Sequence, residues 1–258
     1  EIASCLVGSE MCIRDRKNIW IATSNGINCI DYKTKKITRF YPKSINKECT
    51  TNIINRLLKH SDGNVYAFCN RSVFKCSMNQ TVETVFPDIA IPSPTYSVAQ
   101  APDKDIYIGT ESNGLYIYSE NWKLKKHVPI DGIIATILPD NNGDIWLGLD
   151  ETGICLFNKN KQTFTWLHKD NTNLNNNSIR TFVSYGDSSI LVGTFRGLNI
   201  LNKKELTITP ANINIAGKGG LSHYSIHSML IDKDQTLWIG TYSAAVSYTH
   251  LRAHETRG

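Results

Sequence analysis

Short, mainly hydrophobic runs recur along the chain between polar stretches, and each run is bounded by residues that favour turns. IWIAT begins at Ile19, LWIGT begins at Leu237, and similar runs lie between them. The β-branched and aromatic residues of these runs suit a pleated, half-buried surface. No segment sustains the i, i+3, i+4 spacing of an amphipathic helix. The pattern therefore predicts an all-β chain of short strands.

The strand-like runs belong to a repeat. One aromatic or apolar slot marks each copy, and successive slots are 46, 41, 39, 45 and 47 residues apart. The slot holds Trp20, Tyr66, Tyr107, Trp146, Leu191 and Trp238. Within a copy, a strand is followed by a Gly-containing turn such as Asn113-Gly114, a second strand, a polar turn and a third strand. A fourth strand then leads to the next copy.

Four short antiparallel strands in a repeat of this length are typical of a propeller blade. The Asn-Gly turn supports this assignment, because both residues tolerate the positive φ that tight hairpins require. We therefore predict an all-β fold, a β-propeller fragment built from four-stranded antiparallel blades, with about four to five blades present.

The two ends of the chain do not follow the repeat, but they are related to each other. CLVGSEMCIRD, from Cys5, and VSYTHLRAHET, from Val246, can be encoded by DNA strands that are reverse complements over all eleven residues. We interpret both ends as translated sequencing adaptor, and a natural inverted repeat is the alternative. Such segments are set aside from fold reasoning. The expected division is therefore adaptor-derived residues 1–16, a partial propeller domain at 17–245 and adaptor-derived residues 246–258.

Charge and cysteine content exclude several classes of function. The net charge is +5 and the charged residues are scattered, so we expect no nucleic-acid partner for this chain. There is no C-x-x-C pair, which argues against a zinc or redox motif. His223 and His227 are spaced to share one strand face, but no third ligand is in register. We therefore expect no metal, no cofactor and no catalytic residue.

The repeat resembles that of the two-component regulator propeller family, whose consensus pattern is D-x-x-G-x-[IL]-W-[IV]-G-T-x-x-G-[LI]. Residues 140–148, 237–241 and 106–115 carry the resemblance best. The copy from Gly63 departs from it, because Phe68-Cys69 replaces Gly-Thr, and Leu191 replaces Trp in a later copy. These are packing positions, so the departures concern the regularity of the blades.

The resemblance implies a function that the residues alone do not show. Members form the ligand-sensing, extracytoplasmic propeller of hybrid two-component sensor histidine kinases, and they typically sense oligosaccharides. It implies a periplasmic part of an inner-membrane protein, whose partners are the remaining propeller and membrane-proximal domains. It also implies a homodimeric full-length receptor, and a kinase domain outside this non-enzymatic fragment. The alternatives are a propeller-fold lyase or hydrolase and a non-catalytic scaffold or adhesion propeller.

Ligand residues are expected in the segments that lead into the innermost strands, because rigid blades position the loops that carry function. These segments differ between copies and are rich in side chains that hydrogen-bond or stack on a sugar. The candidate ligand-binding residues are Asn52, Tyr96, Asn177, Arg180, His223 and Tyr224. Two further aromatic residues, Trp122 and Trp166, lie outside the repeat slot, where either strand packing or exposure fits them.

Overall fold

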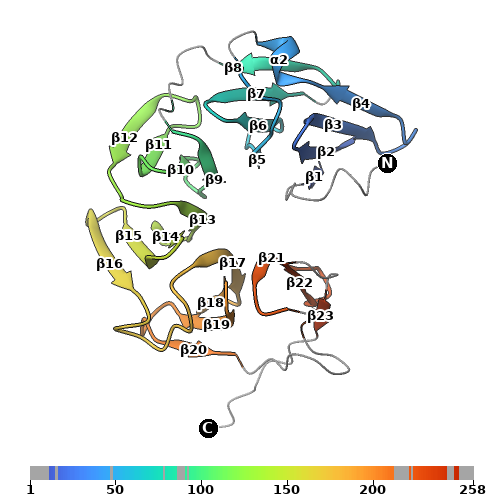
Figure 1. The fold of residues 1–258 in the computed structure, drawn as a ribbon. Coiled ribbons are helices and arrows are strands. Elements are labelled where there is room, and N and C mark those ends of the chain that lie inside the picture. The colour runs from blue at the N-terminus through green and yellow to red at the C-terminus, as the bar shows by residue number, and fades with distance from the viewer. Residues whose placement is uncertain are drawn as a thin grey trace. The chain divides into compact units, whose positions relative to one another are not determined.

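The computed structural model describes residues 12–14, 17–46, 49–77, 79–85, 91, 93–211, 221, 223–242 and 247–249. Nearly all the ordered elements are strands (Figure 1). The chain divides into two compact units, residues 1–143 and residues 144–258, and each is described by itself.

Unit 1 holds the first thirteen strands and one short helix. In chain order they are β1 (Cys12–Arg14), β2 (Asn18–Thr23), β3 (Gly26–Asp31), β4 (Ile37–Phe40), α2 (Pro42–Ile45), β5 (Arg56–Lys59), β6 (Val65–Cys69), β7 (Ser72–Cys76), β8 (Val82–Val85), β9 (Thr95–Gln100), β10 (Ile106–Thr110), β11 (Leu115–Tyr118), β12 (Leu124–Val128) and β13 (Ile134–Pro139).

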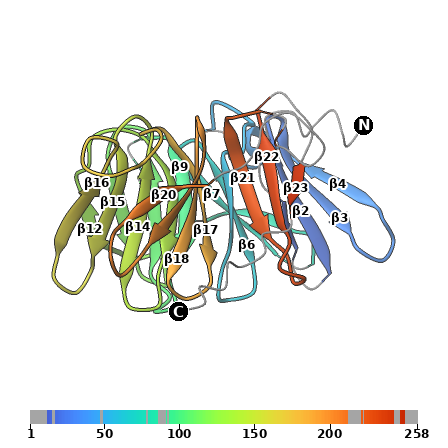
Figure 2. The same cartoon turned by 90° about the horizontal axis from the view of Figure 1, so that it is seen from below.

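Unit 2 holds the remaining strands, and Figure 2 shows β21, β22 and β23 side by side. In chain order they are β14 (Asp144–Leu149), β15 (Gly153–Asn158), β16 (Thr163–Leu167), β17 (Ile179–Tyr185), β18 (Ser189–Thr194), β19 (Gly197–Asn202), β20 (Ile208–Pro210), β21 (Ile226–Ile231), β22 (Leu237–Thr241) and β23 (Ser247–Thr249).

The strands form six antiparallel sheets, each in sequence order, as a blade requires. Five have four strands, β1–β4, β5–β8, β9–β12, β13–β16 and β17–β20, and the sixth has the three strands β21–β23. The prediction of four to five blades therefore undercounted. The strand that precedes each copy pairs with that copy, as β5 pairs with β6, so each of the six copies has its own sheet.

The two terminal segments contribute strands to the first and last sheets. Cys12–Arg14 pairs with β2, and Ser247–Thr249 pairs with β22. Backbone pairing of this kind needs no particular side chains. The adaptor origin of residues 1–16 and 246–258, and the domain boundaries that follow from it, stay predictions. Residues 1–11, 15–16 and 250–258 lie outside the described residues.

Two hydrophobic clusters show how successive sheets pack within a unit. In unit 1, Trp20 of the first sheet lies in a cluster with Ile54, Leu57 and Val65 of the second. In unit 2, Leu191 packs in a cluster with residues of β21 and β22. The repeat slot is thus a core position that faces the next sheet. Trp238 lies in the sixth sheet, the last one among the described residues, and it is 38% exposed.

The described helical part of the chain offers no segment that is long and apolar enough to cross a membrane.

Candidate functional site

The six predicted ligand residues lie at the segments that lead into innermost strands, but they are divided between the two units. Asn52 precedes β5 and Tyr96 lies in β9, both in unit 1. Asn177, Arg180, His223 and Tyr224 lie in unit 2, around the starts of β17 and β21. Of this second group, Arg180 and His223 lie close to exposed aromatic rings, and Tyr224 is itself exposed, as described below.

Asn52 and Asn177 make equivalent hydrogen bonds that hold the chain between two sheets. The hairpin glycine before each donates its N–H to the asparagine carbonyl oxygen, Gly26 at 2.8 Å and Gly153 at 2.9 Å. The Oδ1 atom accepts a backbone N–H, from Lys43 at 3.1 Å for Asn52 and from Lys169 at 2.8 Å for Asn177. Both amide oxygens therefore have a structural role, and their ligand role stays a prediction.

Three strands, β9, β17 and β21, begin with a β-bulge, which the sequence did not reveal. In β9 the register shifts so that Tyr96 is an extra residue between Thr95 and Ser97. The same shift leaves Arg180 extra in β17 and His227 extra in β21. A bulge turns a side chain away from the regular strand direction and is common beside binding sites. His227 thus occupies the position equivalent to Tyr96 and Arg180.

Arg180 is held by an ion pair inside unit 2. Its Nη1 lies 3.3 Å from Oδ2 of Asp150, and both side chains are mostly shielded from solvent. The guanidinium carbon lies 5.9 Å from the centre of the Phe195 ring. Arg180 Nε and Asp150 Oδ1 are buried and have no hydrogen-bond partner among the described residues. Such groups call for a partner such as water or a ligand.

The two histidines of the last innermost strand lie against one tyrosine. The His227 ring stacks on Tyr242 at 5.4 Å between centroids, and the His223 ring lies 6.3 Å from it. His223 Nδ1 accepts the N–H of Ser225 at 3.0 Å. Within the described part of the chain no group of three or more His, Cys, Asp or Glu residues could hold a metal.

Three aromatic side chains beside these groups are open to solvent. Phe195, Tyr224 and Tyr242 are 49%, 57% and 61% exposed, and we name them the aromatic rim. Phe195 and Tyr242 directly follow β18 and β22, so each lies next to the bulge residue of its own sheet. Exposed rings can stack on an apolar ligand face, while Arg180 and His227 supply hydrogen bonds. Residues 212–220, which precede His223 in the chain, lie outside the described residues.

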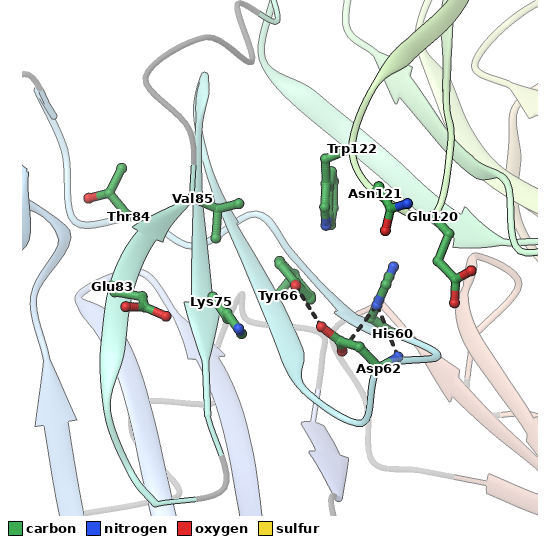
Figure 3. A pocket seen from close by; sticks show the side chains of 10 residues that line it. All are labelled: His60, Asp62, Tyr66, Lys75, Glu83, Thr84, Val85, Glu120, Asn121 and Trp122. Atoms are coloured by element: carbon green, nitrogen blue, oxygen red, sulfur yellow. Dashed lines mark hydrogen bonds and ion pairs between the residues drawn. The ribbon is translucent and has the colours of Figure 1, made fainter.

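A second candidate site is a cavity of about 470 Å³ in unit 1, between the second and third sheets (Figure 3). Cavities of this size hold small molecules. Sequence reasoning missed this cavity, because its lining comes from two turns and three strands, β6, β7 and β8. The lining residues are His60, Asp62, Tyr66, Lys75, Glu83, Thr84, Val85, Glu120, Asn121 and Trp122.

One wall of this cavity is an aromatic cluster, His60, Tyr66 and Trp122. The ring centroids of Tyr66 and Trp122 lie 4.7 Å apart, and the His60 ring stacks on Trp122 with 5.8 Å between centroids. The Tyr66 hydroxyl donates to Oδ2 of Asp62 at 2.8 Å, and His60 Nδ1 lies 3.0 Å from Oδ1 of Asp62 (Figure 3). Trp122 is 7% exposed. These rings are packed against one another and present little free surface.

The hydrogen bonds of the cluster explain its two shifted pKa values. Burial raises the pKa of the Tyr66 hydroxyl, and the nearby Asp62 carboxylate raises it further. Burial also acts to raise the pKa of Asp62, but hydrogen bonds from Asn64, Tyr66 and His60 outweigh it and the pKa is lowered. Asp62 is therefore ionised and Tyr66 neutral near pH 7. Perturbed pKa values can mark functional sites, but here internal packing accounts for them.

Comparison with known proteins supports the repeat assignment. Residues 220–243 match the model of the family described as two component regulator propeller. This match covers the copy with LWIGT at 237–241. No curated protein matches the chain.

Solved structures share the fold over most of the chain. The extracellular domain of BT3049 of B. thetaiotaomicron, described as a hybrid two-component system, has a TM-score of 0.74 at 23% identity, covering 93% of this chain and 33% of that one. The corresponding domain of BT4673 has a TM-score of 0.71 at 17% identity, covering 92% and 32%. This chain thus spans about a third of both domains.

A third solved structure is PorZ of Porphyromonas gingivalis, a surface component of the type-IX secretion system. It has a TM-score of 0.68 at 15% identity, covering 92% of this chain and 38% of that one. Likeness at these identities shows the fold, and the all-β propeller class is confirmed. The resemblance seen in the sequence is confirmed as well: residues 220–243 match the two-component regulator propeller repeat.

Proposed function

We propose that this chain is part of the ligand-sensing, extracytoplasmic propeller of a hybrid two-component sensor histidine kinase, with an oligosaccharide as its ligand. The observation that carries the proposal is the aromatic rim beside Arg180 and His227. Large exposed aromatic side chains on a folded protein mark binding surfaces. The structures of BT3049 and BT4673, which are extracellular domains, support an extracytoplasmic position for the chain.

Several parts of this proposal concern the whole receptor. They are a periplasmic position for the propeller of an inner-membrane protein, a histidine kinase elsewhere in the receptor, and a homodimeric full-length form. The propeller itself binds and does not catalyse. Its direct partners are the rest of the propeller and the membrane-proximal domains.

The proposal is tested by screening the purified chain against an oligosaccharide array, followed by calorimetric titration of each hit. We expect saturable binding without turnover, and weaker binding after Tyr224→Ala. Tyr32→Ala is the matched control, because Tyr32 is also an exposed tyrosine but lies in unit 1. Cleavage of the bound sugar would favour a lyase or hydrolase, and an array without saturable binding would favour a scaffold or adhesion role.

A further inference from the structure

Four cysteines gather in the core between the first and second sheets of unit 1. Cys29, Cys69 and Cys76 are buried members of one hydrophobic cluster, and Cys49 is partly buried against it. All four are free thiols. Ligand binding at the aromatic rim makes no use of them, so the reason for their proximity has to be sought separately.

The loop before β5 and the hairpin of β6 and β7 bring Cys49 and Cys69 together. Cys69 ends β6, and its partner across the hairpin is Ser72. The Cys49 thiol donates to Ser72 Oγ at 3.4 Å. The Cys69 thiol donates to the backbone carbonyl oxygen of Thr51, in the loop that carries Cys49, at 3.4 Å. The Cys49 thiol thus touches the cross-strand partner of Cys69, and the Cys69 thiol touches the residue two positions after Cys49. Opposed residues of a hairpin lie only about 4.5–5.5 Å apart.

We propose that Cys49 and Cys69 are a disulfide-forming pair that is oxidised by an external disulfide donor. The Cys49 thiolate attacks one sulfur of the donor, forming a mixed disulfide and releasing one donor thiol. The Cys69 thiol then loses its proton to solvent and attacks Cys49 Sγ, which releases the second donor thiol. Two protein thiols and one donor disulfide become one protein disulfide and two donor thiols. The bond fastens the loop that carries Asn52 to β6.

Access and acidity set the order of these steps. Cys49 is partly exposed, whereas Cys69 is buried, so the donor reaches Cys49 first. Burial raises the pKa of the Cys69 thiol to about 12, and the neighbouring Cys49 adds to this. Since the thiolate is the attacking form, ring closure is slow near neutral pH and becomes faster as pH rises.

The other close cysteines do not compete while the protein is folded. Cys29 and Cys76 are fully buried in β3 and β7, so a donor in solution does not reach them. Cys155 is buried in β15 of unit 2 and is not a member of this cluster.

The experiment incubates the whole chain with oxidised glutathione under native conditions, quenches with acid, unfolds the protein and counts thiols. Among the five cysteines whose side chains the structure describes, which are all free thiols, we expect three to remain as thiols when each is read from its own peptide. Peptide mapping is expected to join Cys49 to Cys69, at a rate that increases from pH 7 to pH 9. In Cys69→Ser, we expect Cys49 to remain as a glutathione adduct. Cys155→Ser is the control and keeps the Cys49–Cys69 bond.

An unchanged thiol count, glutathione adducts on the wild-type chain without a bridge, or a bridge that joins any other pair overturns the proposal. Mapping of the wild-type chain decides this even if a variant folds poorly. The pair does not depend on ligand binding, so failure here leaves the sensing proposal untouched.

Discussion

The aromatic cluster of unit 1 and the aromatic rim of unit 2 use similar residues in opposite ways. In the cluster, the His60 ring stacks on Trp122 and meets Tyr66 edge to face, and Asp62 accepts a hydrogen bond from the Tyr66 hydroxyl. In the rim, Tyr224 and Tyr242 keep more than half of their surface in solvent. An aromatic side chain thus stabilises the fold where its neighbours close over it, and it is free to bind where they do not.

The largest expected effect is on stability in unit 1. Trp122→Ala removes a large side chain from a packed cluster, which costs about 3–5 kcal/mol in the free energy of unfolding. Denaturant unfolding followed by circular dichroism measures this loss. Trp166→Ala is the matched control, because Trp166 is exposed on β16, and we expect a change of about 1 kcal/mol or less. Equal losses in the two variants would contradict the packing role of Trp122.

The ion pair of unit 2 comes next. Asp150→Asn leaves the guanidinium of Arg180 without its carboxylate, and we expect unfolding to become easier by about 1–3 kcal/mol. Ligand affinity should fall too, because Arg180 loses the contact that orients it. Unfolding and titration of the same sample separate the two effects. If neither changes, the ion pair does not position Arg180.

The aromatic rim itself should affect binding and leave stability alone. We expect Tyr242→Ala to weaken oligosaccharide binding about tenfold, or about 1.4 kcal/mol, because a stacking surface is lost. The free energy of unfolding should change by no more than about 0.5 kcal/mol, as for other exposed positions. Calorimetric titration beside a melting curve tests this, and a large loss of stability with unchanged affinity would reverse the assignment.

The smallest expected effect is a pH dependence of unit 1. The folded pKa of Asp62 is below its ordinary value of 3.8. The unfolded chain therefore binds this proton more tightly, and the stability that Asp62 contributes is present above about pH 4 and is lost as pH falls through the folded pKa. Between pH 6 and pH 2.5, the free energy of unfolding should change less with pH in Asp62→Asn than in the wild-type protein. Parallel curves would show that Asp62 contributes nothing.

The repeat made most of the fold predictable, because strand patterns and hairpin glycines are local features. The slot residues Trp20, Tyr107 and Trp146 are core residues, as their recurrence indicated. The predicted number of blades was too low. The copy to which a connecting strand belongs is decided by its backbone hydrogen bonds, which the sequence pattern does not show. The cavity could not be predicted either: Trp122 reaches the core through a turn with φ of 61°, which sequence alternation does not encode.

The candidate site was predictable in position but not in detail. Sequence variation between copies pointed to the starts of the innermost strands, and Arg180 and Tyr224 lie there in favourable surroundings. The bulges at Tyr96, Arg180 and His227 arise from strand pairing, which no local pattern reports. For that reason His227 was not among the predicted ligand residues, whereas the structure stacks it on Tyr242.

Hydroxyl-radical footprinting with and without a bound oligosaccharide tests the central claim most directly, since it reads both aromatic regions at once. The rim residues Phe195, Tyr224 and Tyr242 should react readily in the free protein and be protected by the ligand. Tyr66 and Trp122 should react slowly in both states, and Tyr32 should react equally in both. Protection at Lys75 or Glu83 of the unit 1 cavity, with Tyr224 and Tyr242 unprotected, would contradict the account.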